Sequence, residues 1–490
     1  MIEFIKSSAF TYWTIIVVYF AITLVTGILL GKRSSKGEDY FLGGRKVGPW
    51  VTALSFVAAY FSSVLIIGGG GFGYKYGLST LWIGAINVLV GCFLVWAVIG
   101  RRVRVMTKRL GTMTVPEFFA ERFSSPAARL FSAAIIIIFL IIYNVSVLKG
   151  MGNAFEVLMG WPYTTAVLVS GLLILIYVAV GGYLAVVWTS FLQAWVMIFA
   201  LVFMSIFAVM AVGGFEKLNH ALSAINMGLV QTPGEWGWAG LISFSLIMSF
   251  GVWGMPQLVV RFYSIEKAKL LRIGTLVATV GGSIALLPYL TGAAARALFP
   301  NLPNPDLAIP TLVKHTLPPW AGGLLLAGVL AAGMSTFASV LIIVSSGVVR
   351  DVVEKGLKIE MSDKRQVLWG RIVSLAAGLI SLVIALKPPD LILVITGFAW
   401  AIIASTNLWP MLFGVYWRGA SKMGVLLSMI TGSFVALAWQ ILGKAGWKLV
   451  ADSGIHGFIP GILISLLIIV LVSLFTKKPS KELLDRAFGD

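Results

Sequence analysis

The stretch SSVLIIGGGGFGYKYG, from Ser62 to Gly77, begins as an apolar helix and then passes through four consecutive glycines, Gly68 to Gly71. Each glycine inside a helix costs about 1 kcal/mol relative to alanine, and a freed backbone group that faces lipid costs considerably more. A tight helix crossing would account for the glycines. A phosphate-binding loop would not, because no Gly-Lys-Ser/Thr follows. We predict instead that the helix is broken here and that its free backbone groups face a cavity inside the protein.

The composition of the chain places this segment in a membrane. Of the 490 residues, 59% are hydrophobic and only 11% are charged, which excludes the soluble classes. The net charge of +18 would suit a nucleic-acid partner, but basic residues of membrane proteins collect in cytoplasmic loops. The single cysteine, Cys92, excludes a disulfide within the chain and a cysteine-based metal cluster.

Apolar runs of about 20 residues, long enough to cross a bilayer, define the predicted spans. The sequence has thirteen, starting near residues 10, 50, 79, 129, 162, 188, 238, 273, 320, 366, 391, 422 and 456. No cleavage site follows the first run and no hydrophilic stretch could hold another domain, so residues 1–490 are predicted to form one membrane domain. With the N-terminus outside, 28 of the 37 Lys and Arg residues are cytoplasmic. This asymmetry predicts a plasma-membrane protein with its C-terminus in the cytoplasm, and it argues against nucleic acid.

Span seven is interrupted as well, because its segment SFGVWGMPQ holds Gly251, Gly254 and Pro256. Five spans separate it from the glycine run of span two, and an odd offset means that the second copy enters the membrane from the opposite side. The pattern predicts an all-α membrane fold with a five-plus-five inverted repeat, whose broken helices form a midplane binding site. Spans two to six, about 50–213, and spans seven to eleven, about 238–416, would be the halves, with spans one, twelve and thirteen peripheral.

Charged residues are missing from the middle of every predicted span. No Asp, Glu, Arg or Lys lies there, and His220, His315 and His456 all map to the outer side. Proton relays usually use intramembrane carboxylates or histidines, so a proton-driven mechanism is not favoured. The same absence leaves this chain without the ligands of a metal enzyme or the base of a triad hydrolase. A sodium ion, by contrast, can be held by hydroxyls and backbone carbonyls alone.

Hydroxyl groups at membrane depth gather in two spans. Span two has Tyr60, Ser62 and Ser63 just before the glycines, and span nine has Ser335 and Thr336 side by side. Small-residue helix packing would explain the second pair. However, consecutive helical residues point about 100° apart, so both hydroxyls rarely face one neighbour, whereas a coordinated ion could use both.

Two longer motifs resemble a known family. The stretches GGYLAVVWTSFLQA, at 181–194, and LAAGMSTFASVLIIVSSGVVRD, at 330–351, are similar to signatures of the sodium:solute symporter family. The resemblance covers almost the whole chain. Within the family the chain looks most like the sodium/pantothenate symporters, through GGGGFGYKYGLS, FGVWGMPQLVVR, IPTLVKHTLPPWAGG and KPPDLI.

The resemblance implies a sodium site and a solute site. The matching positions for sodium ligands are Ala58, Phe61, Ala332, Ser335 and Thr336. The solute cavity is expected where polar and interrupted segments converge, and its predicted residues are Tyr60, Ser62, Ser63, Tyr143, Gly251, Trp253, Gly254 and Pro256. For Tyr143, a buried aromatic ring with a satisfied hydroxyl is at least as good an interpretation. For Trp253, one of 17 tryptophans, the same caution applies.

Two positions depart from the family pattern. Tyr60 stands where proline-transporting members carry an aspartate, which argues against proline as the solute. Ser190 replaces the aspartate of the family signature, which leaves the cytoplasmic end of span six less acidic.

A protein of this family would be a sodium-coupled secondary active symporter, not an enzyme, that imports a small organic solute by alternating access. The subfamily motifs favour pantothenate; proline, another amino acid or a short monocarboxylate is the alternative. A sensor or channel on the same scaffold is less favoured, because the tail after Phe475 is short and the polar groups gather at one depth. The expected partners are the co-transported sodium ion, the solute and the lipid bilayer, without an organic cofactor, nucleic acid or an obligatory protein partner.

Overall fold

The computed structural model of the chain describes residues 8–31 and 37–489. Within these ranges all regular structure is helical, apart from one isolated bridge between Val47 and Ile265. The first seven residues and the charged stretch 32–36, which entered the arguments on leader peptides and sidedness, lie outside the described residues. The predicted all-α fold class is confirmed.

The first half of the chain contains predicted spans one to six. Their helices are α2 (Ser8–Gly31); α4 (Pro49–Tyr60), η2 (Val64–Gly69) and α5 (Gly70–Tyr76); η3 (Gly77–Thr80), α6 (Leu81–Ile86), η4 (Asn87–Leu94), η5 (Trp96–Gly100) and α7 (Arg101–Arg109); α9 (Pro126–Met159); and α10 (Tyr163–Val212). Shorter helices lie between them, namely α3 (Gly37–Leu42), η1 (Gly43–Arg45) and α8 (Val115–Phe123). Gly182, with φ 64° and ψ −179°, divides α10 into spans five and six.

The second half contains spans seven to thirteen. Their helices are α12 (Gly237–Phe250), η8 (Gly251–Gly254) and α13 (Pro256–Ser264); α14 (Leu271–Gly282), η10 (Ser283–Leu286) and α15 (Leu287–Leu298); α17 (Pro319–Ser346) and η12 (Gly347–Glu354); α18 (Asp363–Ala385); α19 (Ile392–Tyr416); α20 (Lys422–Lys444); and α22 (Phe458–Phe475). The connecting helices are α11 (Phe215–Ile225), η6 (Met227–Leu229), η7 (Gly234–Trp236), η9 (Ala268–Leu270), η11 (Pro305–Leu307), α16 (Ala308–Thr316), α21 (Lys448–Ala451) and α23 (Lys481–Phe488).

Eleven helical ranges of the described chain are long and apolar enough to cross a membrane. One of them, Val64–Arg109, contains the second part of span two and all of span three. Two shorter apolar helices, Pro49–Tyr60 and Tyr163–Ile176, supply the first part of span two and span five. Helices therefore occupy all thirteen predicted positions.

α17 forms the centre of the molecule. Every residue of its most apolar window is buried, whereas only 33% are buried in the corresponding windows of α18, α20 and α22. Helices α2, α4, α9, α10 and α18 pack around it. A helix that is apolar on all sides belongs in a core, and small residues let its neighbours approach: a Cβ on Gly333 would lie 2.2 Å from the sulfur of Met151 in α9.

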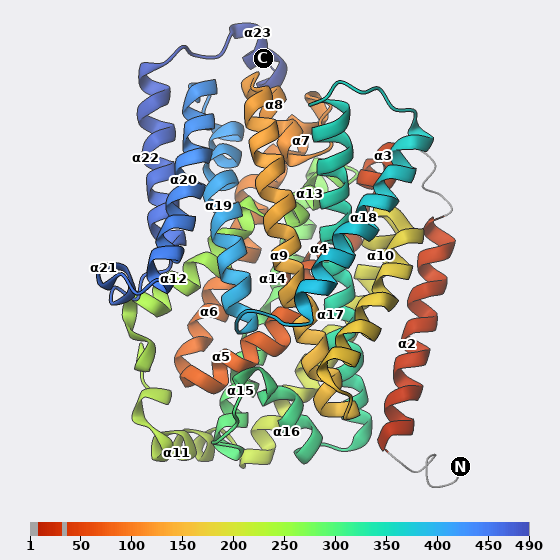
Figure 1. Cartoon of the computed structure of the whole chain (residues 1–490), viewed down its shortest axis with the longest axis vertical. Helices are drawn as coiled ribbons and strands as arrows, with labels where there is room; N and C mark the ends of the chain where they lie inside the picture. Colours follow the sequence, from red (N-terminus) through yellow and green to blue (C-terminus); the bar gives the residue numbers. More distant parts are fainter. Residues whose placement is uncertain (1–7, 32–36, 490) are drawn as a thin grey trace.

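The two broken spans run in opposite directions. Figure 1 places α5, the second part of span two, toward the end with α11, α15 and α16. It places α13, the second part of span seven, toward the end with α7, α8 and α23. This is the relation that a five-plus-five inverted repeat requires. α2 lies at one edge of the molecule, and α20 and α22 lie at the opposite edge (Figure 1).

The break in span two lies before the glycines and not within them. α4 ends at Tyr60, Phe61 has φ −92° and ψ 71°, and the helix resumes at Val64. The glycine run itself is helical and crosses α15 closely, since a Cβ on Gly292 of α15 would lie 1.9 Å from the Gly70 carbonyl oxygen. The prediction that the glycines interrupt the helix is therefore wrong, and the tight helix crossing explains them.

Span seven breaks where the sequence predicted. Gly251–Gly254 form a single 3-10 turn, Met255 is extended with φ −82° and ψ 113°, and Pro256 starts α13. Proline suits this position because the first turn of a helix leaves its N–H groups unpaired. Both interruptions fall near the middle of their spans and face α19.

Candidate functional site

The end of α4 meets two adjacent hydroxyl groups of α17. The Ser335 hydroxyl donates to the carbonyl oxygens of Ala58 and Ala332, at 2.9 Å each. The Thr336 hydroxyl donates to the Ala59 carbonyl oxygen at 3.1 Å. Because α4 stops after Tyr60, no following helical turn supplies amides to the carbonyls of its last turn. These carbonyls are therefore free to accept from the two hydroxyls. Five oxygens from two helices therefore lie together in a buried place.

This cluster contains four of the five residues predicted as sodium ligands. Phe61, the fifth, is the residue at which α4 breaks; its amide donates to the Val57 carbonyl at 2.9 Å, and its ring stacks on Tyr60 with 4.5 Å between centroids. No contact with the two hydroxyls involves Phe61 in the described structure. Ala59 was missed, although consecutive hydroxyls on one helix are well matched to consecutive carbonyls at the end of another.

A narrow cavity lies beside the break. It is lined by the buried side chains of Tyr60, Phe61, Ser62, Val64, Leu65, Asn87, Tyr143, Met248, Tyr289, Leu393, Thr396 and Trp400. Its free volume of about 20 Å³ is close to that of one water molecule. The cavity is thus nearly filled by its own lining, and none of the described residues that line it is charged.

Aromatic rings form one side of the cavity. The Trp400 ring stacks on Tyr60 at 6.0 Å and meets Tyr143 edge-on at 5.7 Å. The Tyr60 hydroxyl donates to the Met248 carbonyl at 2.6 Å and is hydrogen-bonded to Asn87. These contacts join span two to spans three, seven and eleven around one space.

Hydroxyl groups form the other side. The Tyr143 hydroxyl lies 3.3 Å from the Ser62 hydroxyl. One turn along α9, Ser146 is hydrogen-bonded to Thr396 at 2.8 Å. Ser62 also accepts from the amide of Val64 at 3.1 Å, at the start of the resumed helix.

Of the predicted solute residues, Tyr60, Ser62 and Tyr143 line the cavity, whereas the remaining five lie around it. Ser63 donates to the Val147 carbonyl at 2.8 Å, and Trp253 donates to the Val90 carbonyl at 3.1 Å. Gly251 packs on Trp400, Gly254 packs on the backbone of α19, and Pro256 lines a separate small cavity nearer α8.

The sequence reasoning missed the contribution of span eleven. Thr396 and Trp400 of α19 both line the cavity. They are four residues apart in a single helix and therefore share a face. Their spacing indicates that both side chains point to the same side of span eleven. The sequence does not indicate that this side faces the two broken helices.

A buried ion pair lies one turn beyond the cavity, toward α5 and α16. Lys149 of α9 is 3.1 Å from Asp306 of η11 and donates to the Asp390 carbonyl at 2.8 Å. Asp306 accepts from the amide of Ile392 at 3.1 Å, and a Cβ on Gly71 would lie 2.8 Å from its other oxygen. Burial raises the pKa of Asp306, and the Lys149 ammonium opposes that rise. This pair joins α9, α5 and the start of α19.

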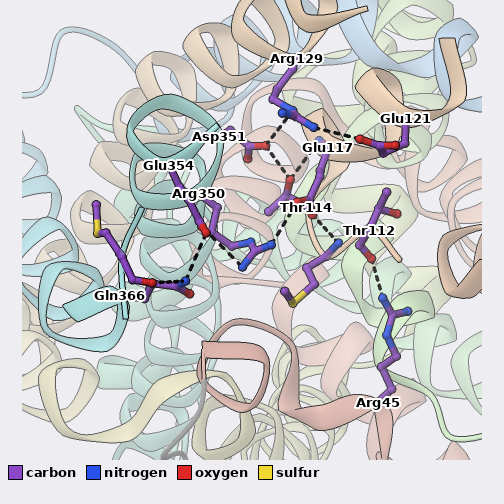
Figure 2. A network of polar contacts seen from close by, with 12 residues as sticks. Arg45, Thr112, Thr114, Glu117, Glu121, Arg129, Arg350, Asp351, Glu354 and Gln366 are labelled. Carbon is purple, nitrogen blue, oxygen red and sulfur yellow. Dashed lines mark hydrogen bonds and ion pairs between the residues drawn. The ribbon is translucent and has the colours of Figure 1, made fainter. Parts of the chain in front are cut away.

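A larger polar network lies toward the opposite end, near α8 (Figure 2). Arg350 of η12 is 3.0 Å from Glu117 of α8. The Thr114 hydroxyl donates to Asp351 at 3.0 Å, and Arg129 at the start of α9 lies 3.9 Å from the same carboxylate. Breaking a buried pair by removing one partner costs about 3–5 kcal/mol, so these contacts hold α8, α9 and η12 firmly together.

The network extends to the surface. Figure 2 shows Glu121 beside Arg129, Gln366 beside Glu354, and Arg45 beside the Thr112 carbonyl. Beyond it, Arg486 of the C-terminal helix α23 is 3.0 Å from Glu121. The sequence reasoning did not find this network, because its members come from separate loops and helix ends.

Comparison with known proteins identifies the family of this chain. The model of the sodium:solute symporter family matches residues 40–432. The chain belongs to the sodium:solute symporter family. It is 33% identical over 474 residues to the osmoregulated proline transporter OpuE of Bacillus subtilis (strain 168), covering 95% of this chain and 94% of that protein. It is 32% identical over 482 residues to the sodium/proline symporter of Staphylococcus aureus (strain JH9), covering 95% and 93%.

Solved structures share the fold of this symporter-family chain. A Na+-coupled sialic acid symporter in a substrate-bound outward-open state aligns with a TM-score of 0.78 at 18% identity, covering 96% of this chain and 99% of that one. Mhp1, a nucleobase-cation-symport-1 family transporter, aligns with a TM-score of 0.55 at 13% identity, covering 92% and 98%. The expected family is thus confirmed. The pantothenate subfamily is not supported, because the relatives named here are proline transporters.

Proposed function

We propose that this protein imports proline or a similar small zwitterion together with sodium. The observation that carries the proposal is the narrow uncharged cavity beside the broken end of α4, the same helix end that brings five oxygens suited to a cation together. The names of the two relatives supply the solute class.

The residues that line the cavity suit a small molecule without net charge, although the cavity must widen from its present volume of about 20 Å³ to admit one. Because no charged side chain lines it in the described chain, a solute with a full net charge would lose hydration without a partner. The rings of Tyr60, Tyr143 and Trp400 offer apolar surface to a small hydrocarbon body. The helix that restarts at Val64 presents its N-terminal end to a carboxylate, and the carbonyl end of α4 suits an ammonium group.

Sodium would bind where Ser335 and Thr336 meet α4. Its ligands in this proposal are the two hydroxyls and the carbonyls of Ala58, Ala59 and Ala332. The Phe61 carbonyl stays a predicted further ligand. Neutral oxygens suffice for one monovalent cation. The ion would hold the broken end of α4 against α17, next to the solute.

Alternating access follows from the two closures. The Lys149–Asp306 pair closes the end near α5 and α16, and the Glu117–Arg350 network closes the end near α8. Opening one closure while the other holds exposes the cavity to one side at a time. Because sodium and solute favour the same closed state, each raises the affinity of the other by an equal factor.

The end with α7, α8 and α23 carries most basic residues and would face the cytoplasm of a plasma membrane. In this orientation the start of α2 faces outward and α23 faces inward.

A binding screen with the purified protein tests the solute class. Proline, pantothenate, acetate, pyruvate and glucose are each titrated with sodium and with choline in its place. The proposal expects saturable proline binding that sodium strengthens at least tenfold. Sodium-dependent binding of pantothenate without proline would overturn the solute class and favour the other interpretation, to which the tyrosine at position 60 points.

A further inference from the structure

A second cavity lies at the membrane boundary, away from the transport site. Its volume is about 390 Å³, and it is lined by Trp96, Ala97, Arg101, Ala268, Lys269, Leu271, Arg272 and Thr275. These residues come from the junction of η5 with α7 and from the start of α14. The cavity therefore lies at the basic end of two neighbouring spans.

Three cations converge there without a counter-charge. Arg101, Lys269 and Arg272 all line the cavity and are exposed. None of the described carboxylates pairs with any of them, and no acid lines the cavity. The N-terminal end of α14, at Leu271, adds the partial positive charge of a helix start. Together these features give the cavity a strong preference for an anion.

The cavity walls are fixed by buried contacts. The guanidinium of Arg104, which is 4% exposed, donates to the carbonyls of Ile265 and Glu266 at 2.6 and 3.2 Å. This ties the loop before α14 to α7. Below it, a Cβ on Gly274 would lie 2.1 Å from the Trp96 ring, so α14 and η5 touch directly. The backbone that carries the three cations is thus fixed by the fold.

Apolar surface leads from the cavity into the membrane. On α14, Ile273, Leu276 and Val280 are 43%, 67% and 64% exposed. On η4, Leu89 and Phe93 are 56% and 42% exposed. Both sets lie on the same spans as the cations, nearer the middle of those spans. A ligand with an anionic head and two hydrocarbon tails matches this combination of charge and surface.

We propose that this cavity binds the phosphate headgroup of an anionic phospholipid of the adjoining leaflet. Arg101, Lys269 and Arg272 hold the phosphodiester, and the acyl chains lie along α14 and η4. Such a lipid would bridge spans three and eight and stabilise their packing. The site is independent of the proposed solute and sodium sites.

The test compares phosphatidylglycerol with phosphatidylcholine of the same acyl chains. Thermal unfolding of the purified full chain is followed as each lipid is titrated into detergent. The expected result is stabilisation by phosphatidylglycerol at concentrations about tenfold lower than phosphatidylcholine requires. The triple variant Arg101→Gln, Lys269→Gln, Arg272→Gln should lose this preference, because each basic residue near a lipid headgroup contributes several-fold to affinity.

A matched control removes the same charge elsewhere at the same end. Lys355, Lys364 and Arg365 are exposed and line neither this cavity nor the two cavities of the transport path. Their triple change to Gln should alter the preference less than twofold. Equal losses in both triples, or an unchanged preference in the cavity triple, would overturn the site. Equal stabilisation of the wild type by inorganic phosphate would show a free-anion site instead. If the triple variant does not fold, the single variant Arg272→Gln replaces it. Its preference for phosphatidylglycerol over phosphatidylcholine is expected to fall about threefold.

Discussion

At Thr336, the contribution of the side-chain hydroxyl can be tested without changing the shape of the side chain. Its hydroxyl is buried and reaches the carbonyl of Ala59 at the broken end of α4, 3.1 Å away. Ser335 beside it reaches Ala58 in the same way. In the proposed site these hydroxyls are the side-chain ligands of sodium, and a buried cation depends strongly on each neutral oxygen that replaces its hydration.

Thr336→Val keeps the shape of the side chain and removes its oxygen. We expect the sodium concentration for half-maximal uptake to rise about tenfold, since a hydrogen-bond-like contact to a charge contributes about 1.5–3 kcal/mol. Solute affinity at saturating sodium should change little. Thr406→Val is the control, because the Thr406 hydroxyl donates only to Ile402 of its own helix, at 2.8 Å. An unchanged sodium dependence in Thr336→Val would contradict the site.

Gly73, two residues after the glycine run, tests the close crossing of α5 with α15. We expect Gly73→Ala to destabilise the protein by about 1–3 kcal/mol or more, because its Cβ would overlap the Tyr289 carbonyl and force α5 away from α15. Gly48→Ala is the control, since a Cβ at Gly48 meets nothing within 4 Å. Melting temperature in detergent measures both. Equal stability of the two variants would mean that the crossing tolerates a side chain.

The two interrupted spans show which parts of the fold could be predicted from the sequence. An unusual segment in span two was recognised, and the break of span seven was located at Gly251–Pro256. The break of span two was misplaced, because glycine signals both a loosened helix and a close crossing, and only the partner helix α15 decides between them. The polar groups of span eleven and the Glu117–Arg350 pair could not be predicted, since their meeting depends on contacts between distant segments.

The contact between α8 and η12 makes a prediction about conformational change. Glu117→Gln removes the charge that faces Arg350 at 3.0 Å and should weaken the closure near α8. The population open at that end should rise. A cysteine at Ser346, which lines the small cavity beside Asp351, should then react with a thiol reagent several-fold faster in a Cys92→Ser background.

Glu360→Gln is the matched control, because Glu360 is exposed and has no partner in the described residues. Its effect on the reactivity of the cysteine at position 346 should be negligible. If Glu117→Gln leaves that reactivity at the wild-type rate, the network stabilises the fold without acting as a gate.

The arrangement of the protein in the bilayer can be tested with two single cysteines. Lys364→Cys, in the first turn of α18, and Lys448→Cys, in α21, are separated by three spans, α18, α19 and α20. In a Cys92→Ser background and in intact cells, an impermeant thiol reagent should label position 448 and spare position 364, because most basic residues lie at the end with position 364. Labelling of position 364 alone would invert the topology.

Sodium-driven proline uptake into proteoliposomes is a single measurement that depends on the solute cavity, the proposed sodium site and the two closures together. An inward sodium gradient is imposed with radioactive proline outside, and a potassium medium with an inward proton gradient is the comparison. Coupled transport predicts transient accumulation of proline above its external concentration with sodium, and only slow equilibration with protons. Equal accumulation under the proton gradient without sodium, or no proline uptake under either gradient, would contradict sodium-coupled proline symport.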